Sequence, residues 1–164
     1  MRWGTFLAIL FAAYLLQALL PIRPEYLPLL LALAIVCGLN APTDDARIAA
    51  WLCGLMLDLT GEPHLIGVNS LAFGLTGVIL TWLRESGVSA AGPARFIIAV
   101  LAAWPGQFLY DILAFGAREG GYSVWAGLAR TLLTASIASV VALIFAVFPV
   151  MVLHRRRLGR AGKW

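Results

Sequence analysis

The sequence predicts an all-α integral membrane protein, a compact bundle of about six transmembrane helices. Hydrophobic residues make up 62% of the chain and charged residues only 12%, with a mean hydropathy of +0.90. A soluble domain carries about 25% charged residues, so this chain has too little polar surface to coat a water-soluble globule. The apolar residues form runs separated by short turns rich in Gly and Pro. The 164 residues suit a single domain, 1–164, without repeats.

The first two apolar runs flank a turn that contains Pro21 and Pro24. Residues 3–20 follow an N-terminal arginine, as in a signal peptide, but hydrophobic segments continue along the chain, so we expect a retained span. The second run, 26–39, is shorter than the roughly 20 residues that cross a bilayer. It tilts, thins the membrane locally or lies partly buried in protein. These alternatives leave open whether it crosses the membrane fully.

The next two runs, 46–60 and 65–83, are predicted to form a helical hairpin. Thr43 or Asp44 is the expected N-cap of the first helix, because short polar side chains accept bonds from its first N–H groups. The break between the helices reads Thr60-Gly61-Glu62-Pro63-His64. Its Gly and Pro end one helix and let the next begin.

The last two spans are predicted over residues 96–115 and 124–153. The first contains Pro105-Gly106, where we expect a kink that neighbouring helices tolerate. The second would be about 45 Å long at 1.5 Å per residue, so its end leaves the membrane or bends at Pro149. A basic cytoplasmic tail, 154–164, follows.

The distribution of basic residues predicts the orientation. Six spans put both termini on one side, and a basic tail after an apolar helix identifies that side as the cytoplasm. Five of the twelve basic residues are in the last ten positions: Arg155, Arg156, Arg157, Arg160 and Lys163. The same topology places Arg2, Arg47, Arg84 and Arg95 inside, and only Arg23 and Arg118 in outer loops. No nucleic-acid-binding motif accompanies the tail, so nucleic acid is not an expected partner.

Three ionisable residues lie within the predicted spans: Asp58, Asp111 and Arg130. The topology places all three in the outer half of the bilayer, where an unpaired charge costs at least about 2.5 kcal/mol. We therefore expect a cluster in which Arg130 pairs with one or both acids. Two interpretations stay open: the cluster only fixes helix packing, or its acids bind a ligand or partner.

Small residues recur at the four-residue spacing that lets helices approach closely. Such pairs are Ala8 with Ala12, Ser70 with Gly74, and Ala135 with Ser139. Intramolecular packing is the simpler expectation, and a partner-facing surface is the alternative. Gly54 stands one turn before Asp58, so we expect a neighbouring helix to approach beside the acid.

No pattern in the chain points to catalysis, a metal or a cofactor. His64, in the outer turn, is expected to be solvated. Cys37 and Cys53 show no metal-ligand spacing and are interpreted as small apolar residues. The chain shows no nucleophile–base set and no phosphate-binding loop. We therefore predict a protein that is not an enzyme.

The segment from Gly54 to Arg84 resembles the central signature of the rod-shape-determining membrane protein family MreD. In that family a Gly-x-x-x-Asp helix end leads through a Gly/Pro turn to a Leu-Gly helix start. The matching positions are Gly54, Asp58, Leu59, Gly61, Pro63, Gly67 and Asn69. Length, span count and a basic cytoplasmic end are also similar to MreD, whereas Asp111 and Arg130 match no family motif.

The resemblance implies a non-enzymatic component of the bacterial inner membrane that acts in cell elongation and peptidoglycan synthesis. Its implied partner is the single-span protein MreC. Through MreC it would act with the MreB filament, the glycosyltransferase RodA and a penicillin-binding transpeptidase. The implied fold is similar to the six-helix substrate-binding subunits of energy-coupling-factor vitamin transporters.

That fold similarity keeps a second hypothesis open, a substrate-binding subunit of a vitamin transporter. The Ala8-x-x-x-Ala12 pair is of the kind those subunits use for docking, although such spacing is common in membrane helices. The cluster of Asp58, Asp111 and Arg130 would then line a pocket. A third hypothesis, an intramembrane enzyme, lacks a recognisable nucleophile–base pair. The sequence leaves open the oligomeric state, the partner-binding helices, a bound lipid and the protonation of Asp58.

Overall fold

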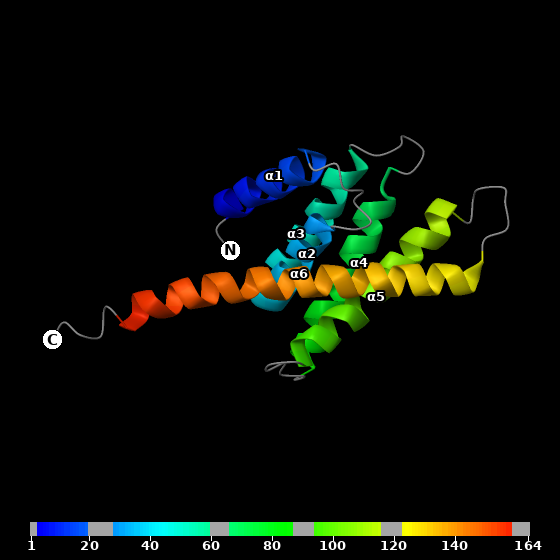
Figure 1. Cartoon of the computed structure of the whole chain (residues 1–164). Coiled ribbons are helices and arrows are strands. Elements are labelled where there is room, and N and C mark those ends of the chain that lie inside the picture. Colours follow the sequence, from blue (N-terminus) through cyan, green and yellow to red (C-terminus); the bar gives the residue numbers. More distant parts are fainter. Residues whose placement is uncertain (1–2, 20–27, 60–65, 87–93, 116–122, 159–164) are drawn as a thin grey trace.

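The computed structural model describes residues 3–19, 28–59, 66–86, 94–115 and 123–158 (Figure 1). Within these ranges the chain forms six α-helices and no strand, which confirms the predicted all-α class. The helices are α1 (Trp3–Leu19), α2 (Leu29–Asn40), α3 (Thr43–Asp58), α4 (Val68–Glu85), α5 (Ala94–Phe115) and α6 (Val124–Leu158). In the described part of the chain, Ala94–Ala114 and Val124–Ile144 are long and apolar enough to cross a membrane, and α1 and α2 are shorter apolar helices.

Two helix ends differ from the expected ones. The N-cap of α3 is Pro42, in an extended conformation, so the prediction of Thr43 or Asp44 is wrong. Thr43 is instead the first helical residue, and its hydroxyl bonds to Glu85 of α4. At the other end of the chain, α6 continues through Pro149 to Leu158 rather than ending at residue 153. By contrast, α5 runs through Pro105 as one helix, in agreement with the predicted span that contains Pro105-Gly106.

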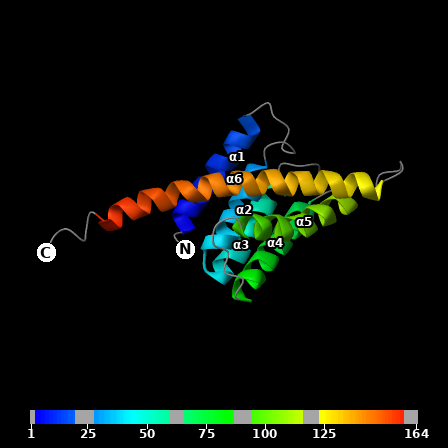
Figure 2. The same cartoon turned by 60° about the horizontal axis from the view of Figure 1, so that its bottom comes forward.

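Five helices form a closed ring and α1 stands outside it. Along the ring α2 packs on α3, α3 on α4, α4 on α5 and α5 on α6, and α6 returns to α2. The helix α1 packs on α2 and lies at the margin of the bundle in both views (Figures 1 and 2). The start of α1 and the end of α6 lie toward the same side in both views, and the end of α6 extends beyond the other helices.

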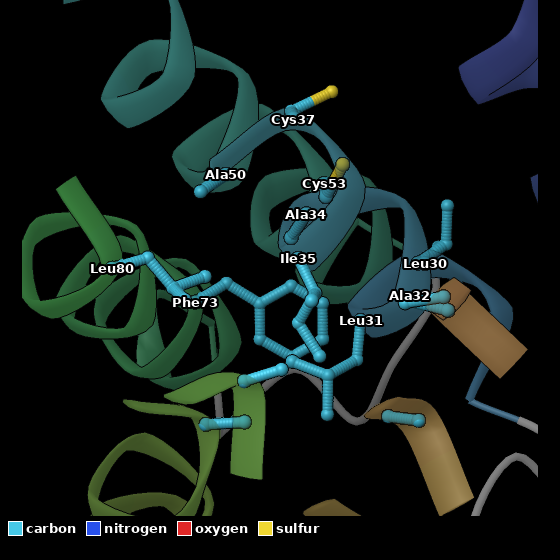
Figure 3. Packing of buried hydrophobic residues seen from close by; sticks show 14 of the residues in the cluster. Leu30, Leu31, Ala32, Ala34, Ile35, Cys37, Ala50, Cys53, Phe73 and Leu80 are labelled. Carbon is cyan, nitrogen blue, oxygen red and sulfur yellow. The ribbon is translucent and has the colours of Figure 1, made fainter. Parts of the chain in front are cut away.

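The core is centred on α2, where eight of twelve residues are buried. Leu30, Leu31 and Ile35 are at most 1% exposed. Figure 3 shows Leu31 and Ile35 directed toward Phe73 of α4, in the same buried cluster. Of the alternatives that the sequence left open for this short run, burial in protein is the one that fits this position.

Elsewhere small residues are frequent where the helices meet, and many large apolar residues face outward. Eleven alanines belong to the buried core: Ala32, Ala34, Ala49, Ala50, Ala72, Ala99, Ala102, Ala103, Ala135, Ala138 and Ala142. Large apolar side chains are exposed on every helix for which side chains are described except α2, among them Leu19, Trp82 and Trp125, which are 62–83% exposed. A soluble monomer rarely exposes large contiguous apolar surface, and its core usually holds the large side chains.

Glycines mark the closest helix crossings. A Cβ on Gly77 of α4 would lie 2.7 Å from the Cβ of Ala50 on α3. A Cβ on Gly106 of α5 would overlap the carbonyl oxygen of Ala72 on α4 and lie 2.5 Å from the hydroxyl of Thr76. Because real Cβ atoms do not approach backbone this closely, the α4–α5 crossing requires glycine at position 106.

We expect Gly106→Val to destabilise the folded bundle by about 1–3 kcal/mol, because the added atoms force α5 away from Ala72 and Thr76. The measurement is thermal unfolding of the purified protein in detergent. Gly4→Val is the matched control, since nothing lies within 4 Å of a Cβ at Gly4. Equal melting temperatures for the two variants would contradict this account of the crossing.

Candidate functional site

The beginning of α4 carries the chemistry of the candidate site. Its N-cap is Gly67, in the left-handed region at φ 94°. Glycine adopts this conformation without a steric penalty, but it has no side chain to accept bonds from the first N–H groups of the helix. Those groups lie at a buried junction and therefore need an acceptor from elsewhere in the chain.

Asp58, the last residue of α3, is that acceptor. Its Oδ1 accepts a bond from the backbone N–H of Asn69 at 3.0 Å, and its Oδ2 accepts one from the N–H of Ser70 at 2.8 Å. The Ser70 hydroxyl also donates to Oδ2, at 2.5 Å. The carboxylate thus caps α4 from another helix and sits at the positive end of its dipole. Three donors compensate an acid that is only 2% exposed.

Gly54 allows α4 to come close enough for this cap. It precedes Asp58 by one helical turn, so both residues lie on the same face of α3. A Cβ on Gly54 would overlap the carbonyl oxygen of Asn69 and lie 2.6 Å from the Cα of Ser70. The Gly-x-x-x-Asp spacing is therefore a docking device: the glycine admits the start of α4, and the acid one turn later binds it.

A second charged cap joins α2, α3 and α4 at the opposite end of α4. One guanidinium nitrogen of Arg84 donates to the carbonyl oxygens of Ala41 and Gly38, at 2.6 and 3.2 Å. These carbonyls belong to the C-terminal end of α2, where a cation is favourable. The other nitrogen lies 3.3 Å from the Thr43 hydroxyl, and that hydroxyl donates to Glu85 at 2.8 Å.

Arg47 of α3 adds a weaker contact beside this cap. Its Nε donates to the Thr81 hydroxyl at 3.0 Å, and its side chain is 3.8 Å from the carboxylate of Glu85. The side chain of Arg47 is 39% exposed and that of Glu85 is 51% exposed. Exposed ion pairs contribute at most about 1 kcal/mol to stability. The hydrogen bond and the Arg84 cap therefore hold this end together more than the ion pair does.

For the predicted cluster of Asp58, Asp111 and Arg130, the structure describes the bonding partners of Asp58 only. The bonds described for Asp58 are all with α4, which the sequence analysis did not foresee. Asp111 is 4% exposed on α5, and Arg130 is exposed on α6. Both have interaction partners of their own. A cluster of all three residues stays a prediction.

The structure brings four of the seven matching positions together: Gly54, Asp58, Gly67 and Asn69 meet where α3 ends and α4 begins. Leu59 follows Asp58 and is 70% exposed. Gly61 and Pro63 lie outside the described residues, as does His64.

Among the predicted packing pairs, Ala8 and Ala12 are exposed on α1, so the chain itself does not bury them. Ser70 is buried against Asp58, and Gly74 faces Trp51 of α3. The third pair, Ala135 and Ser139, is fully buried on α6.

Sequence reasoning missed two polar contacts. It treated Arg84 only as a topological charge, although a basic residue in the last turn of a helix is suited to bind carbonyl groups of a nearby helix end. It also passed over Gln17, whose side-chain oxygen lies 3.4 Å from the backbone nitrogen of Leu30 at the start of α2. The N-cap there is Pro28, which makes no side-chain cap of its own.

The arrangement joins two helices through groups that bond to each other. The Asp58 oxygens accept three bonds, all of them from α4. Within the described ranges, no three His, Cys, Asp or Glu side chains group so as to hold a metal ion. Cys37 and Cys53 are buried free thiols.

Comparison with known proteins adds no relative: no family model, no curated protein and no solved structure matches the chain.

We expect Asp58→Ala to lower the stability of the bundle by about 1–3 kcal/mol, because it leaves two N–H groups of α4 and the Ser70 hydroxyl without their acceptor. Thermal unfolding in detergent measures the effect. Asp44→Ala is the control, an exposed acid in the first turn of the same helix. A loss for Asp44→Ala as large as for Asp58→Ala would contradict the capping role.

Gly54→Ala is expected to destabilise by a similar amount, because the methyl group meets the backbone of Asn69 and Ser70 rather than a movable side chain. Gly74→Ala is the matched control, since its Cβ would make an ordinary 3.6 Å contact with Trp51. Alanine there should be neutral or stabilising by up to about 1 kcal/mol. The same unfolding measurement applies, and a harmless Gly54→Ala would refute the close approach.

Proposed function

We propose that the chain is a multi-pass membrane protein whose six helices cross the bilayer with both ends in the cytoplasm. The distribution of side-chain sizes supports this: alanine is the commonest residue of the buried core, and many large apolar residues face outward. Membrane helices associate through such small residues, which let their backbones pack closely. Large apolar side chains gain little from burial, because lipid is equally apolar. The start of α1 and the end of α6 lie toward one side of the bundle, as an even number of spans requires (Figure 2).

Within that membrane we propose a non-enzymatic component of the bacterial cell-elongation complex, similar to MreD. The observation that carries this proposal is the junction of Gly54, Asp58, Gly67 and Asn69. Four positions that match the MreD signature converge on one physical task, the docking and capping of α4. A protein that acts by presenting helix surfaces to partners needs a fixed arrangement of helices, and signature residues that hold two helices together suit that need.

Such a protein acts through the surfaces that its helices present. The exposed apolar flanks and the marginal helix α1 offer surface to a single-span partner of the MreC type. Through that partner the bundle would act with MreB, a RodA-type glycosyltransferase and a penicillin-binding transpeptidase. The proposed location is the bacterial inner membrane.

One observation favours a second candidate, the substrate-binding subunit of a vitamin transporter. Ala8 and Ala12 are exposed on α1 instead of packing inside the chain, and a small-residue pair on an outer helix suits docking to a coupling subunit. The same exposed pair also suits an MreC-type helix, so α1 alone does not separate the two functions.

The test is purification of the tagged chain from native membranes, followed by identification of what co-purifies. We expect an MreC-type protein in the wild-type sample and a reduced amount with Asp58→Ala, because a loosened α3–α4 joint displaces the presented surface. Asp44→Ala is again the control. Depletion of the protein should make rod-shaped cells round. A co-purifying vitamin without an MreC-type protein would favour the transporter subunit and overturn this proposal.

A further inference from the structure

Two oppositely charged side chains on the surface of the α3–α4 pair keep hydrogen-bonding groups that the chain does not use. Arg47 of α3 makes one described hydrogen bond, from Nε to the Thr81 hydroxyl at 3.0 Å. Its Nη2 lies 3.8 Å from Oε2 of Glu85, which is beyond hydrogen-bonding distance. Glu85 accepts its one described hydrogen bond through the other oxygen, Oε1, from Thr43. The terminal nitrogens of Arg47 and the Oε2 atom of Glu85 can therefore bind a further group.

An apolar strip runs along the same face, from this Arg47–Glu85 pair toward the middle of both helices. On α4 it comprises Gly74, Val78 and Trp82, which precede the glutamate at spacings of three or four residues and so share its face. On α3, Trp51 follows the arginine by one turn and lies 3.6 Å from a Cβ placed on Gly74. Trp51, Val78 and Trp82 are 45–62% exposed. The strip thus crosses from one helix to the other beside the charged pair.

The proposed topology turns this face toward the cytoplasmic leaflet of the membrane. Arg47 and Arg84 are the charges that the topology places on the cytoplasmic side. Trp82 stands one turn before the end of α4 and is exposed, as is typical of tryptophans at the membrane–water interface. The charged pair then lies at the level of the lipid headgroups, and the apolar strip extends along the acyl chains.

We propose that the Arg47–Glu85 pair and the apolar strip bind phosphatidylethanolamine of the cytoplasmic leaflet. The inference rests on the proposed membrane embedding. A guanidinium matches phosphate oxygens with its planar fork of N–H donors. The carboxylate of Glu85 matches the ammonium group that a short ethylene bridge joins to this phosphate. A purely anionic headgroup would satisfy Arg47 but bring a negative charge beside Glu85, where like charges repel. Charge complementarity therefore selects a headgroup that carries both signs.

The test is native mass spectrometry of the full chain in detergent. The added ligands are phosphatidylethanolamine and phosphatidylglycerol with identical acyl chains, and soluble phosphoethanolamine. We expect the wild type to bind phosphatidylethanolamine about tenfold more strongly than phosphatidylglycerol, the effect of one charge-assisted contact. Equal binding of the two lipids, or a preference for phosphatidylglycerol, would overturn the proposal. Displacement of the lipid by soluble phosphoethanolamine at equal concentration would overturn it too, because the apolar strip would then hold no lipid.

Two variants test the two charges separately. Arg47→Gln should weaken phosphatidylethanolamine binding about tenfold, because it removes the partner of the phosphate. Glu85→Gln should abolish the preference for phosphatidylethanolamine, and its amide oxygen can still accept the hydrogen bond from Thr43. Arg95→Gln is the control, an exposed arginine at the start of α5. Melting temperatures verify that each variant is folded. An unchanged preference in Glu85→Gln would contradict the site, as would equal lipid binding by Arg47→Gln and the wild type.

Two further measurements separate this inference from the proposed function. Release of the chain from membranes by alkaline carbonate would overturn the membrane proposal itself. A chain that stays in the membrane but shows no preference for phosphatidylethanolamine would overturn the lipid site alone. Loss of an MreC-type partner with Arg47→Gln, while the lipid stays bound, would show that the charged pair contacts protein, and that result also overturns the lipid site alone.

Discussion

The capping of α4 by Asp58 is the interaction on which the rest of the structure depends. The carboxylate satisfies two backbone N–H groups and the Ser70 hydroxyl at a buried junction. An acid in an apolar setting is costly when it stands alone. Here the backbone N–H groups of Asn69 and Ser70 stabilise the charge of Asp58, and these groups themselves need an acceptor. The two costs cancel only when α3 and α4 adopt this one relative position.

The fixed α3–α4 pair then determines where the other helices lie. At the opposite end of α4, Arg84 binds the carbonyl end of α2 and so brings the central helix against the pair. On its other side α4 receives α5 at Gly106, and α6 closes the ring between α5 and α2. Charged caps thus set the ends of the helices, and small residues set the distances between them. Both are needed. Packing of small residues does not fix the direction of a helix, and a charged cap acts only on the terminal turn of a helix.

This division of labour agrees with the proposed role. A protein that works by presenting helix surfaces to partners needs a rigid frame and outward-facing apolar side chains. The polar contacts buried between α3 and α4 make the frame rigid and leave the outer apolar side chains exposed. The marginal position of α1 offers a surface that we propose for a transmembrane partner.

The sequence alone established the helical class and the order of the helices, because apolar runs bounded by Gly and Pro leave the backbone to satisfy its own hydrogen bonds. It also singled out Gly54 and Asp58, because an acid in an apolar run needs compensation. Only the tertiary structure decided what compensates it. The sequence suggested other charged side chains, whereas the structure supplies two backbone N–H groups and the Ser70 hydroxyl. Because every residue except proline carries a backbone N–H, the sequence does not reveal which of these groups will meet the acid. Their placement depends on the turn at Gly67 and on contacts between distant segments, which is also why Arg84 escaped notice.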